Sequence, residues 1–406
     1  MTRHAITAGF LPLTDSALLV AAKVMGFAEA EELDLTLVRE TSWANIRDRI
    51  AVGHFEAAHM LAPMPIASNL GLTPLPLPLI APMALGLGGN AVTVSAKLWT
   101  SMADEGARAD LDPAVNGAAL KRVIVGHAAG ETLQFAVVHP FSGHGYELRY
   151  WFAACGIDPV SDIDIVVVPP SMMADALRTG RIDGYCAGEP WNSVGVDKAS
   201  GHLATVKAAI WKSSPEKVLG VQAEWAGANP DALDALLRAL HRASIWCADR
   251  GNHPELASIL SRPEWINVAP ELILRGLVGQ LETGNGPVAV PDFFLTHDRA
   301  ATFPWQSHAL WFYSQMARWG QATHSAENAL VAKDSYRPDI YRRALRPTGA
   351  ALPGANAKVE GALKVATGVG SVQGKLVLGP DGFFDGQVFD PDKLDDYIAR
   401  QATNRG

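Results

Sequence analysis

Short apolar runs of strand type alternate with longer segments in which apolar residues recur at helical spacing. Proline, glycine and capping residues separate the two kinds of segment. The pattern predicts strands at 4–9, 34–38, 56–60, 121–126, 163–168, 182–187 and 217–222. It predicts helices at 17–31, 43–52, 147–156, 171–177, 230–249, 254–260, 270–281 and 304–319. This alternation is typical of an α/β protein with a parallel or mixed sheet.

Two stretches break the pattern. Residues 101–119 are polar and lack a regular spacing of apolar residues, which predicts an insertion or a long loop. Residues 349–379 are rich in Ala, Gly and Val, which predicts a loosely ordered extension before a hairpin-like end and a short helix. At 406 residues, the chain is long enough to form two lobes.

The chain contains one long uncharged stretch, between His59 and Lys97. Its proline density forbids a regular membrane-spanning helix, so buried short strands and turns are expected and no membrane association. The first strand is predicted to begin at His4, and no export signal with an unbroken apolar core precedes it. The first cysteine, Cys155, is far from the start, so no lipid anchor is expected there. These features predict a cytoplasmic protein.

Composition excludes several classes of function. The net charge of -8 argues against a nucleic-acid-binding face, so no direct nucleic-acid contact is expected. Cys155, Cys186 and Cys247 are isolated from one another, which gives no support for a metal site or a disulfide framework. They are consistent with a reducing compartment.

No motif supports catalysis or a cofactor. Gly86-x-Gly88-x-x-Ala91 matches a dinucleotide-binding pattern, but a strand follows where that pattern requires a helix. The chain has no G-x-S-x-G elbow and no cysteine in a nucleophile context. We therefore expect neither an enzyme nor a resident cofactor.

Four residues are candidate ligands of a small anion. Lys217 precedes an apolar strand and can supply a counter-charge, and His144 lies in a glycine-flanked turn before a helix. Trp43 offers a flat ring and Asn90 an amide. Each also fits a structural role: an exposed lysine, a helix-capping histidine, a core tryptophan and an asparagine in a turn.

Residues 8 to 320 carry, in order, a series of distinctive segments: GFLPLTDSALLVAAKVMGF, LDLTLVRETSWANIRD, AAHMLAPMP, YWFAACGIDPVSDIDIVVVPPSMM, GEPW, WKSSPEKVLG and FPWQSHALWF. On these segments the chain resembles the nitrate- and bicarbonate-binding proteins of ABC transporters. The resemblance implies a two-lobed, periplasmic-binding-protein-like fold of type II with a ligand cleft between the lobes. We accordingly assign 1–96 and 217–348 to lobe I, 120–216 to lobe II, 97–119 to a loop and 349–406 to a C-terminal extension.

The resemblance also implies a set of ligand-binding residues. The family's stacking tryptophan falls on Trp43, its histidine on His144 and its PEK lysine on Lys217. Its glutamine falls on Asn90, a departure that keeps the amide and shortens its reach. The first two residues of the GEPW segment, Gly188 and Glu189, are expected to line the pocket. No metal ligand is assigned.

With no export signal evident, the chain is most similar to cytoplasmic nitrate/nitrite sensors of the NasS type. That resemblance implies two partners: nitrate or nitrite, and an RNA-binding antiterminator of the ANTAR class. The ligand-free sensor would sequester the antiterminator and release it on ligand binding, so that nitrate-assimilation genes are transcribed. Three alternatives remain: a transporter-associated nitrate-binding protein, a calcium-associated bicarbonate-binding protein, and an enzyme like the relatives that make the thiamine pyrimidine.

Overall fold

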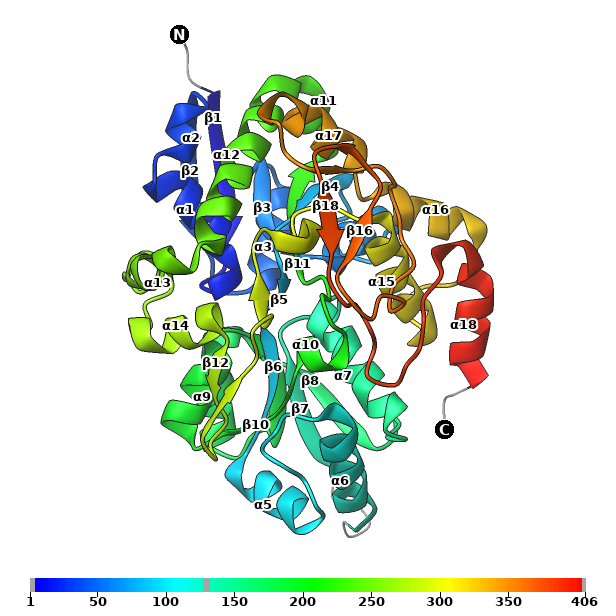
Figure 1. The fold of residues 1–406 in the computed structure, drawn as a ribbon. Coiled ribbons are helices and arrows are strands. Elements are labelled where there is room, and N and C mark those ends of the chain that lie inside the picture. The colour runs from blue at the N-terminus through cyan, green and yellow to red at the C-terminus, as the bar shows by residue number, and fades with distance from the viewer. Residues whose placement is uncertain (1–3, 127–131, 404–406) are drawn as a thin grey trace.

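The computed structural model describes residues 4–126 and 132–403. Within them, two five-stranded mixed sheets lie in separate parts of the molecule, one above the other in Figure 1. The order of the first sheet is β2-β1-β3-β11-β4 and that of the second is β10-β6-β9-β7-β8. Helices flank both sheets, so the predicted α/β class is confirmed.

The first sheet is built mainly from the N-terminal residues. Parallel pairing joins β1 to β2 and β3, and antiparallel pairing joins β11 to β3 and β4. The strands are β1 (His4–Phe10), β2 (Leu33–Arg39), β3 (Ala57–Leu61), β4 (Leu79–Ala84) and β11 (Lys217–Gln222). Its associated helices are α1 (Ala17–Val24), α2 (Phe27–Ala30), α3 (Trp43–Ala51), α4 (Pro63–Asn69), α11 (Ala223–Ala228), α12 (Pro230–Ala248) and α13 (His253–Leu260).

The second sheet uses the middle of the chain. Antiparallel pairing joins β6 to β9 and β10, and parallel pairing joins β7 to β8 and β9. The strands are β6 (Asn90–Val94), β7 (Leu133–Val137), β8 (Ile163–Val167), β9 (Gly184–Gly188) and β10 (His202–Val206). The helices are α5 (Ala96–Asp104), α6 (Pro113–Gly126), α7 (Gly143–Ala154), α8 (Met173–Arg178), α9 (Trp191–Ala199) and α10 (Lys207–Ile210).

The chain passes between the sheets at two places, from β4 to β6 and from β10 to β11. The remaining elements continue from these parts. They are β5 (Leu87–Gly88), α14 (Pro270–Val278), β12 (Gln280–Glu282), β13 (Pro287–Ala289), β14 (Phe294–Leu295), α15 (Gln306–Arg318), α16 (Ala326–Asp334) and α17 (Pro338–Leu345). No helix within the described residues is both long and apolar enough to cross a bilayer.

Several element predictions were wrong. The predicted loop over 101–119 is largely helical, and the predicted strand over 121–126 is the end of α6. Asp112 begins α6 by accepting hydrogen bonds from the N–H groups of residues 114 and 115, a capping signal hidden by the preceding polar residues. The β-branched run near residue 124 suggested a strand, but tertiary packing overrides such local preference. The predicted helix over 17–31 is divided at Gly26, whose φ is 75°.

The domain boundaries stay a prediction, but two details differ from it. Residues 90–94, placed in lobe I from sequence, form β6 of the second sheet. The interval between residues 97 and 119 contains helix rather than a loop alone.

The C-terminal residues are not loosely ordered, contrary to the prediction. They form β15 (Leu352–Pro353), β16 (Thr367–Val369), β17 (Ser371–Gln373), β18 (Leu376–Leu378) and α18 (Leu394–Thr403), which packs on α15. The ring of Phe383 stacks on Trp211, with ring centroids 4.6 Å apart. Glu360 is fully buried and ion-paired with Lys358. Aromatic packing and buried charge therefore fix this segment along one side of the molecule (Figure 1, orange to red).

Candidate functional site

Lys217, the first residue of β11, is buried rather than exposed. Its Nζ lies 2.8 Å from Oδ2 of Asp15 and 2.8 Å from Oε1 of Glu216. Burial alone would lower the pKa of Lys217, but the charges of the two carboxylates outweigh it and raise the pKa above its usual value. An ammonium group has three N–H donors. These two partners therefore leave one donor for a ligand.

Besides Lys217, Asp15 has a second basic side chain beside it, His59. Nε2 of His59 lies 3.0 Å from Oδ1 of Asp15, and the N–H of Leu11 points to Nδ1 of the same ring at 3.5 Å. Burial lowers the pKa of His59, so the ring is neutral beside the Asp15 carboxylate. Burial alone would raise the pKa of Asp15, but the combined effect of Lys217 and His59 is larger and lowers the pKa below its usual value. Asp15 therefore stays ionised.

Trp43 is the first residue of α3, and Ser42 caps that helix by accepting from the N–H of Asn45 at 3.2 Å. The buried indole stands edge-on to His59, with ring centroids 5.2 Å apart. Nζ of Lys217 lies 5.5 Å from the centre of the indole ring, within cation–π range. The indole Nε1 is buried and has no hydrogen-bond partner among the described residues.

His144 lies in the first turn of α7, where Ser142 caps the helix through the N–H of Gly145. Nδ1 of His144 is 2.6 Å from Oε1 of Glu216, and Nε2 is buried without a partner in the described chain. Gly143 permits this approach, because a Cβ there would lie 2.8 Å from Oε2 of Glu216. Burial lowers the pKa of His144 despite the charge of Glu216.

Glu216 joins His144 and Lys217 to a second lysine, Lys207. The Lys207 ammonium is ion-paired with Glu216 and lies 3.1 Å from Oε1 of Glu147. Burial alone would raise the pKa of Glu216, but Lys207 and Lys217 hold it well below its usual value. Burial raises the pKa of Glu147 to about 8, although Lys207 opposes the shift. Two ionised carboxylates, those of Asp15 and Glu216, thus balance two ammonium groups.

Asn90 and Gly188 are paired neighbours on β6 and β9. Asn90 is fully buried, and neither its Oδ1 nor its Nδ2 has a partner among the described residues. A Cβ on Gly188 would lie 3.2 Å from Oδ1 of Asn90, 3.1 Å from Leu13 and 3.4 Å from Oδ2 of Asp15. Gly188 therefore lies where the Asn90 amide and the Asp15–Lys217 pair meet.

The backbone carbonyl and the side-chain carboxylate of Glu189 have different partners. Its carbonyl accepts from the N–H of Thr14 at 2.8 Å. Its Oε2 accepts from the N–H of Ser193 at 3.1 Å, and its stem packs beside Gly276 of α14. Burial raises the pKa of Glu189 to about 7. The side chain of Glu189 is therefore held at Ser193 and Gly276.

Five of the six predicted residues thus come together in one buried cluster, which we call the polar cluster: Trp43, Asn90, His144, Gly188 and Lys217. Sequence analysis missed the titratable partners of the cluster: Asp15, His59, Glu147, Lys207 and Glu216. Asp15 and His59 each lie inside an apolar run, and that isolation was the available signal. The polar cluster offers unpaired Trp43 Nε1 and Asn90 Nδ2 donors, which can bind a small acceptor-rich molecule.

The described residues do not group three or more His, Cys, Asp or Glu side chains so that they could hold a metal ion. The lysines interleaved with the acidic side chains account for this at the polar cluster. Ammonium groups occupy the positions beside Asp15 and Glu216 that a cation would take.

Comparison with known proteins identifies the family. The model of the NMT1-like family matches residues 2–261. The chain belongs to the NMT1-like family. It is 33% identical to the nitrate/nitrite binding protein NrtA of Synechococcus elongatus, over 97% of this chain and 85% of that protein. It is 27% identical to the bicarbonate-binding protein CmpA of the same species, over 97% of this chain and 85% of that protein.

A solved structure supports the same relationship. The crystal structure of the periplasmic nitrate-binding protein NrtA from Synechocystis PCC 6803 superposes with a TM-score of 0.85. The identity is 27%, and the match covers 98% of each chain. The predicted periplasmic-binding-protein-like fold of type II is confirmed. These relatives are named as binding proteins and not as enzymes.

Proposed function

We propose that this protein binds nitrate or nitrite at the polar cluster. The supporting observation is a set of buried polar atoms that the protein leaves without partners: Trp43 Nε1, Asn90 Nδ2 and His144 Nε2. Each buried polar atom without a partner costs about 1–3 kcal/mol. The Trp43 and Asn90 donors therefore favour a ligand that accepts hydrogen bonds, and His144 adds a third donor when its ring is protonated. The relatives named as nitrate-binding proteins give the anion its identity.

Nitrate is planar and offers acceptor oxygens in three directions. In the proposed complex, Lys217 donates its third N–H, Asn90 and His144 donate from the second sheet's side, and Trp43 supplies a donor and a flat wall. Micromolar affinity requires about 8 kcal/mol. A charge-assisted hydrogen bond contributes roughly 1.5–3 kcal/mol, so several of these contacts must act together.

The residues come from both sheets, which gives binding a mechanical consequence. Lys217 and Trp43 belong to the first-sheet side, whereas Asn90 and Gly188 lie on strands of the second. An anion that contacts both groups favours the arrangement in which the two sheets approach. A ligand changes a conformational equilibrium only by its difference in affinity for the two states, and these shared contacts supply that difference.

The finer proposal is that the protein is a cytoplasmic sensor. The ligand-free form binds an ANTAR-type RNA-binding antiterminator, and nitrate or nitrite releases it. The resemblance of the chain to cytoplasmic sensors of the NasS type motivates this role. If the anion and the partner prefer different arrangements, each weakens the other's binding by the same factor. A transporter-associated nitrate-binding or bicarbonate-binding protein is the alternative, and CmpA is the relative that motivates its bicarbonate form.

Calorimetric titration of the anion-stripped protein tests the binding step. Nitrate or nitrite should bind with micromolar affinity, and chloride should not. A bicarbonate response that requires calcium, without a response to nitrate or nitrite, would replace the proposal by the bicarbonate alternative.

The sensor step needs a separate experiment. A purified ANTAR-domain antiterminator from the same organism should co-elute with the nitrate-free protein and separate from it when nitrate is added. Co-elution that nitrate does not change, or no complex at all, rejects the sensor role and leaves anion binding intact. Cell fractionation tests the proposed cytoplasmic location.

A further inference from the structure

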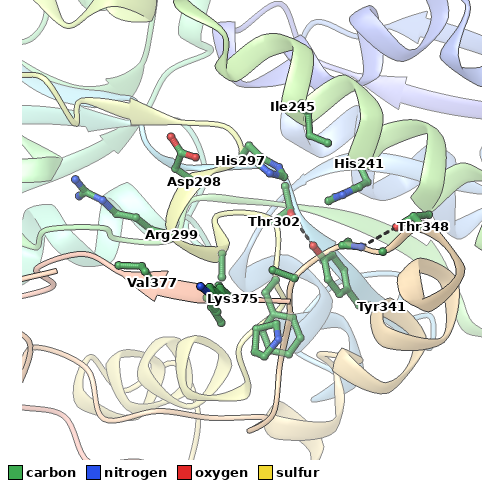
Figure 2. A pocket seen from close by; sticks show the side chains of 17 residues that line it. His241, Ile245, His297, Asp298, Arg299, Thr302, Tyr341, Thr348, Lys375 and Val377 are labelled. Atoms are coloured by element: carbon green, nitrogen blue, oxygen red, sulfur yellow. Dashed lines mark hydrogen bonds between the residues drawn. The ribbon is translucent and has the colours of Figure 1, made fainter. Parts of the chain in front are cut away.

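A cavity of about 640 Å³ is lined by the 17 residues drawn in Figure 2. None of Trp43, Asn90, His144 or Lys217 lines it. Its walls come from α12, the turn at Asp298–Ala300, α17 and the C-terminal residues 348–351, 353 and 375–377. Its size falls within the range of small-molecule sites, roughly 300–1,000 Å³. The cavity therefore has walls from both the C-terminal segment and the helices α12 and α17.

Two histidines form one wall of this cavity. The rings of His241 and His297 have centroids 5.2 Å apart. Ser244 donates its hydroxyl to the carbonyl of His241 at 2.7 Å, so its oxygen accepts Nδ1–H of His297 at 3.0 Å. That assignment leaves Nε2 of the His297 ring as an acceptor when the ring is neutral.

His241 is the less satisfied of the two. Its side chain is 7% exposed, and Nδ1 has no hydrogen-bond partner among the described residues. Burial lowers the pKa of His241 to about 4, so the ring is neutral at physiological pH. A neutral imidazole presents one donor and one acceptor. A buried ring of this kind on a cavity wall is a ready partner for a polar group of a ligand.

Cationic side chains lie on the other walls. Lys375 is exposed and has no ion-pair partner within residues 4–126 and 132–403. Arg299 is paired with Asp292 at 2.7 Å, and its backbone has a φ of 61°. Asp298 is the one carboxylate among the described residues that line the cavity, where Arg299 and Lys375 are the two cations. Because Asp292 neutralises Arg299, Lys375 is the group that would attract an anion.

The remaining lining combines apolar side chains, among them Ile245, Phe303 and Leu376, with the hydroxyl-bearing Thr302, Tyr341 and Thr348. We propose that this cavity is a second ligand site, which takes a small organic anion with an apolar body and a carboxylate or phosphate head. The head lies towards Lys375 and Arg299, the apolar body lies against Phe303 and Leu376, and His241 meets a polar group of the ligand. Such a ligand would bridge β18 and α12. This site does not depend on the nitrate proposal.

Fluorescence titration with 8-anilino-1-naphthalenesulfonate, an aromatic organic anion, tests the site. The full-length protein should enhance the dye's fluorescence at micromolar concentration. Ile245→Trp should fill the cavity and Lys375→Glu should reverse its charge, and each should weaken binding at least about tenfold. Leu330→Trp and Lys364→Glu are matched controls, because both residues are exposed and outside the lining. They should bind the dye as the native protein does.

Displacement of the dye then identifies the head group. Benzoate and phenyl phosphate share one apolar body and differ in the head, whereas benzamide is the uncharged counterpart of benzoate. Displacement by either anion and not by benzamide supports the proposal and names the head. Dye binding that Ile245→Trp and Lys375→Glu leave unchanged overturns it. Displacement by benzamide as effectively as by the anions, or by none of the three, also overturns it.

Discussion

Nδ1 of His144 lies 2.6 Å from Oε1 of Glu216, the same oxygen that lies 2.8 Å from Nζ of Lys217. Because Lys207 and Lys217 keep the pKa of Glu216 low, this carboxylate is ionised and can only accept hydrogen bonds. Nδ1 of His144 must therefore carry a proton. In a neutral ring, Nε2 is then a lone pair and cannot donate to an anion. His144 can bind an anion only as imidazolium.

Nitrate binding should therefore take up one proton at His144. Burial holds the pKa of His144 below 6.5 in the free protein, and the anion favours the charged ring. Above that pKa, each rise of one pH unit should weaken binding about tenfold until the complex itself loses the proton. Calorimetry between pH 5.5 and 7.5, in buffers of different ionisation enthalpy, measures the proton uptake.

The control for this prediction is His144→Gln, whose amide donates without titrating. Its nitrate affinity should be weaker and flat over the same range of pH. His59 is already placed against a carboxylate, with Nε2 3.0 Å from Oδ1 of Asp15, and Glu147 titrates higher, near pH 8. A native protein that takes up no proton on binding nitrate would contradict the role given to His144.

Replacing Lys217 should weaken both binding and folding. In Lys217→Ala the anion loses a charge-assisted contact, which should weaken nitrate binding roughly 10- to 150-fold. The buried carboxylates of Asp15 and Glu216 also lose a partner, which should cost about 3–5 kcal/mol of stability. Titration and urea denaturation measure the two effects. Lys212→Ala is the matched control, because Lys212 is exposed and should change neither. Native-like affinity in a folded Lys217→Ala protein would refute the site.

How far the polar cluster could be predicted depends on the kind of information it uses. Trp43, His144 and Lys217 were found because each lies in a distinctive segment that resembles a known binding motif. Their charge environment could not be found in this way. The sequence around Lys217 does not indicate a partner for its charge. In the fold, Oδ2 of Asp15, some 200 residues away in the chain, lies 2.8 Å from Nζ of Lys217. Glu189 shows the converse, since a matching motif did not reveal where its side chain points.

The fold shows the same limit at residues 121–126 and in the C-terminal segment. β-branched residues in KRVIVG favoured a strand, but Gly117, earlier in α6, packs against Cys155 and Trp151, and the helix continues to Gly126. Ala- and Gly-rich composition suggested a loose tail, but the buried side chains of Glu360 and Phe383 fix it. Both errors come from long-range packing, which overrides local preference.

Asn90 offers a direct test of the unpaired amide. Asn90→Leu keeps the approximate shape and removes two buried polar atoms that have no partner among the described residues. The free protein should be as stable as the native protein or more so, whereas nitrate binding should weaken about 5- to 10-fold, the worth of one hydrogen bond. Thermal denaturation with and without nitrate reports both quantities.

Asn116→Leu is the counterpart of that variant. Asn116 is equally buried, but its amide bonds the carbonyls of Arg108 and Ala204 at 2.8 and 2.7 Å and accepts the N–H of Arg108. This variant should lose about 1–3 kcal/mol of stability and keep its nitrate affinity. If both asparagines behaved alike, the distinction between a ligand-binding amide and a structural amide would be wrong.

Acid should weaken the attachment of the C-terminal segment through Glu360. This buried carboxylate accepts from Ser307 at 2.7 Å and is paired with Lys358, which also lies 2.9 Å from Asp381. Burial would raise the pKa of Glu360, but Lys358 and His308 lower it to about 2. Because the folded-state pKa lies below the unfolded value of 4.5, the ionised group stabilises the fold above pH 4.5. That stabilisation, about 3 kcal/mol for a shift of this size, is lost as the pH falls towards 2.

Urea denaturation from pH 7 to pH 3 measures this loss. The variant Glu360→Gln starts from a lower stability and should lose less of it in acid. Glu327→Gln is an exposed control and should lose as much stability as the native protein. An equal acid-induced loss in the native protein and Glu360→Gln would mean that other carboxylates govern acid unfolding.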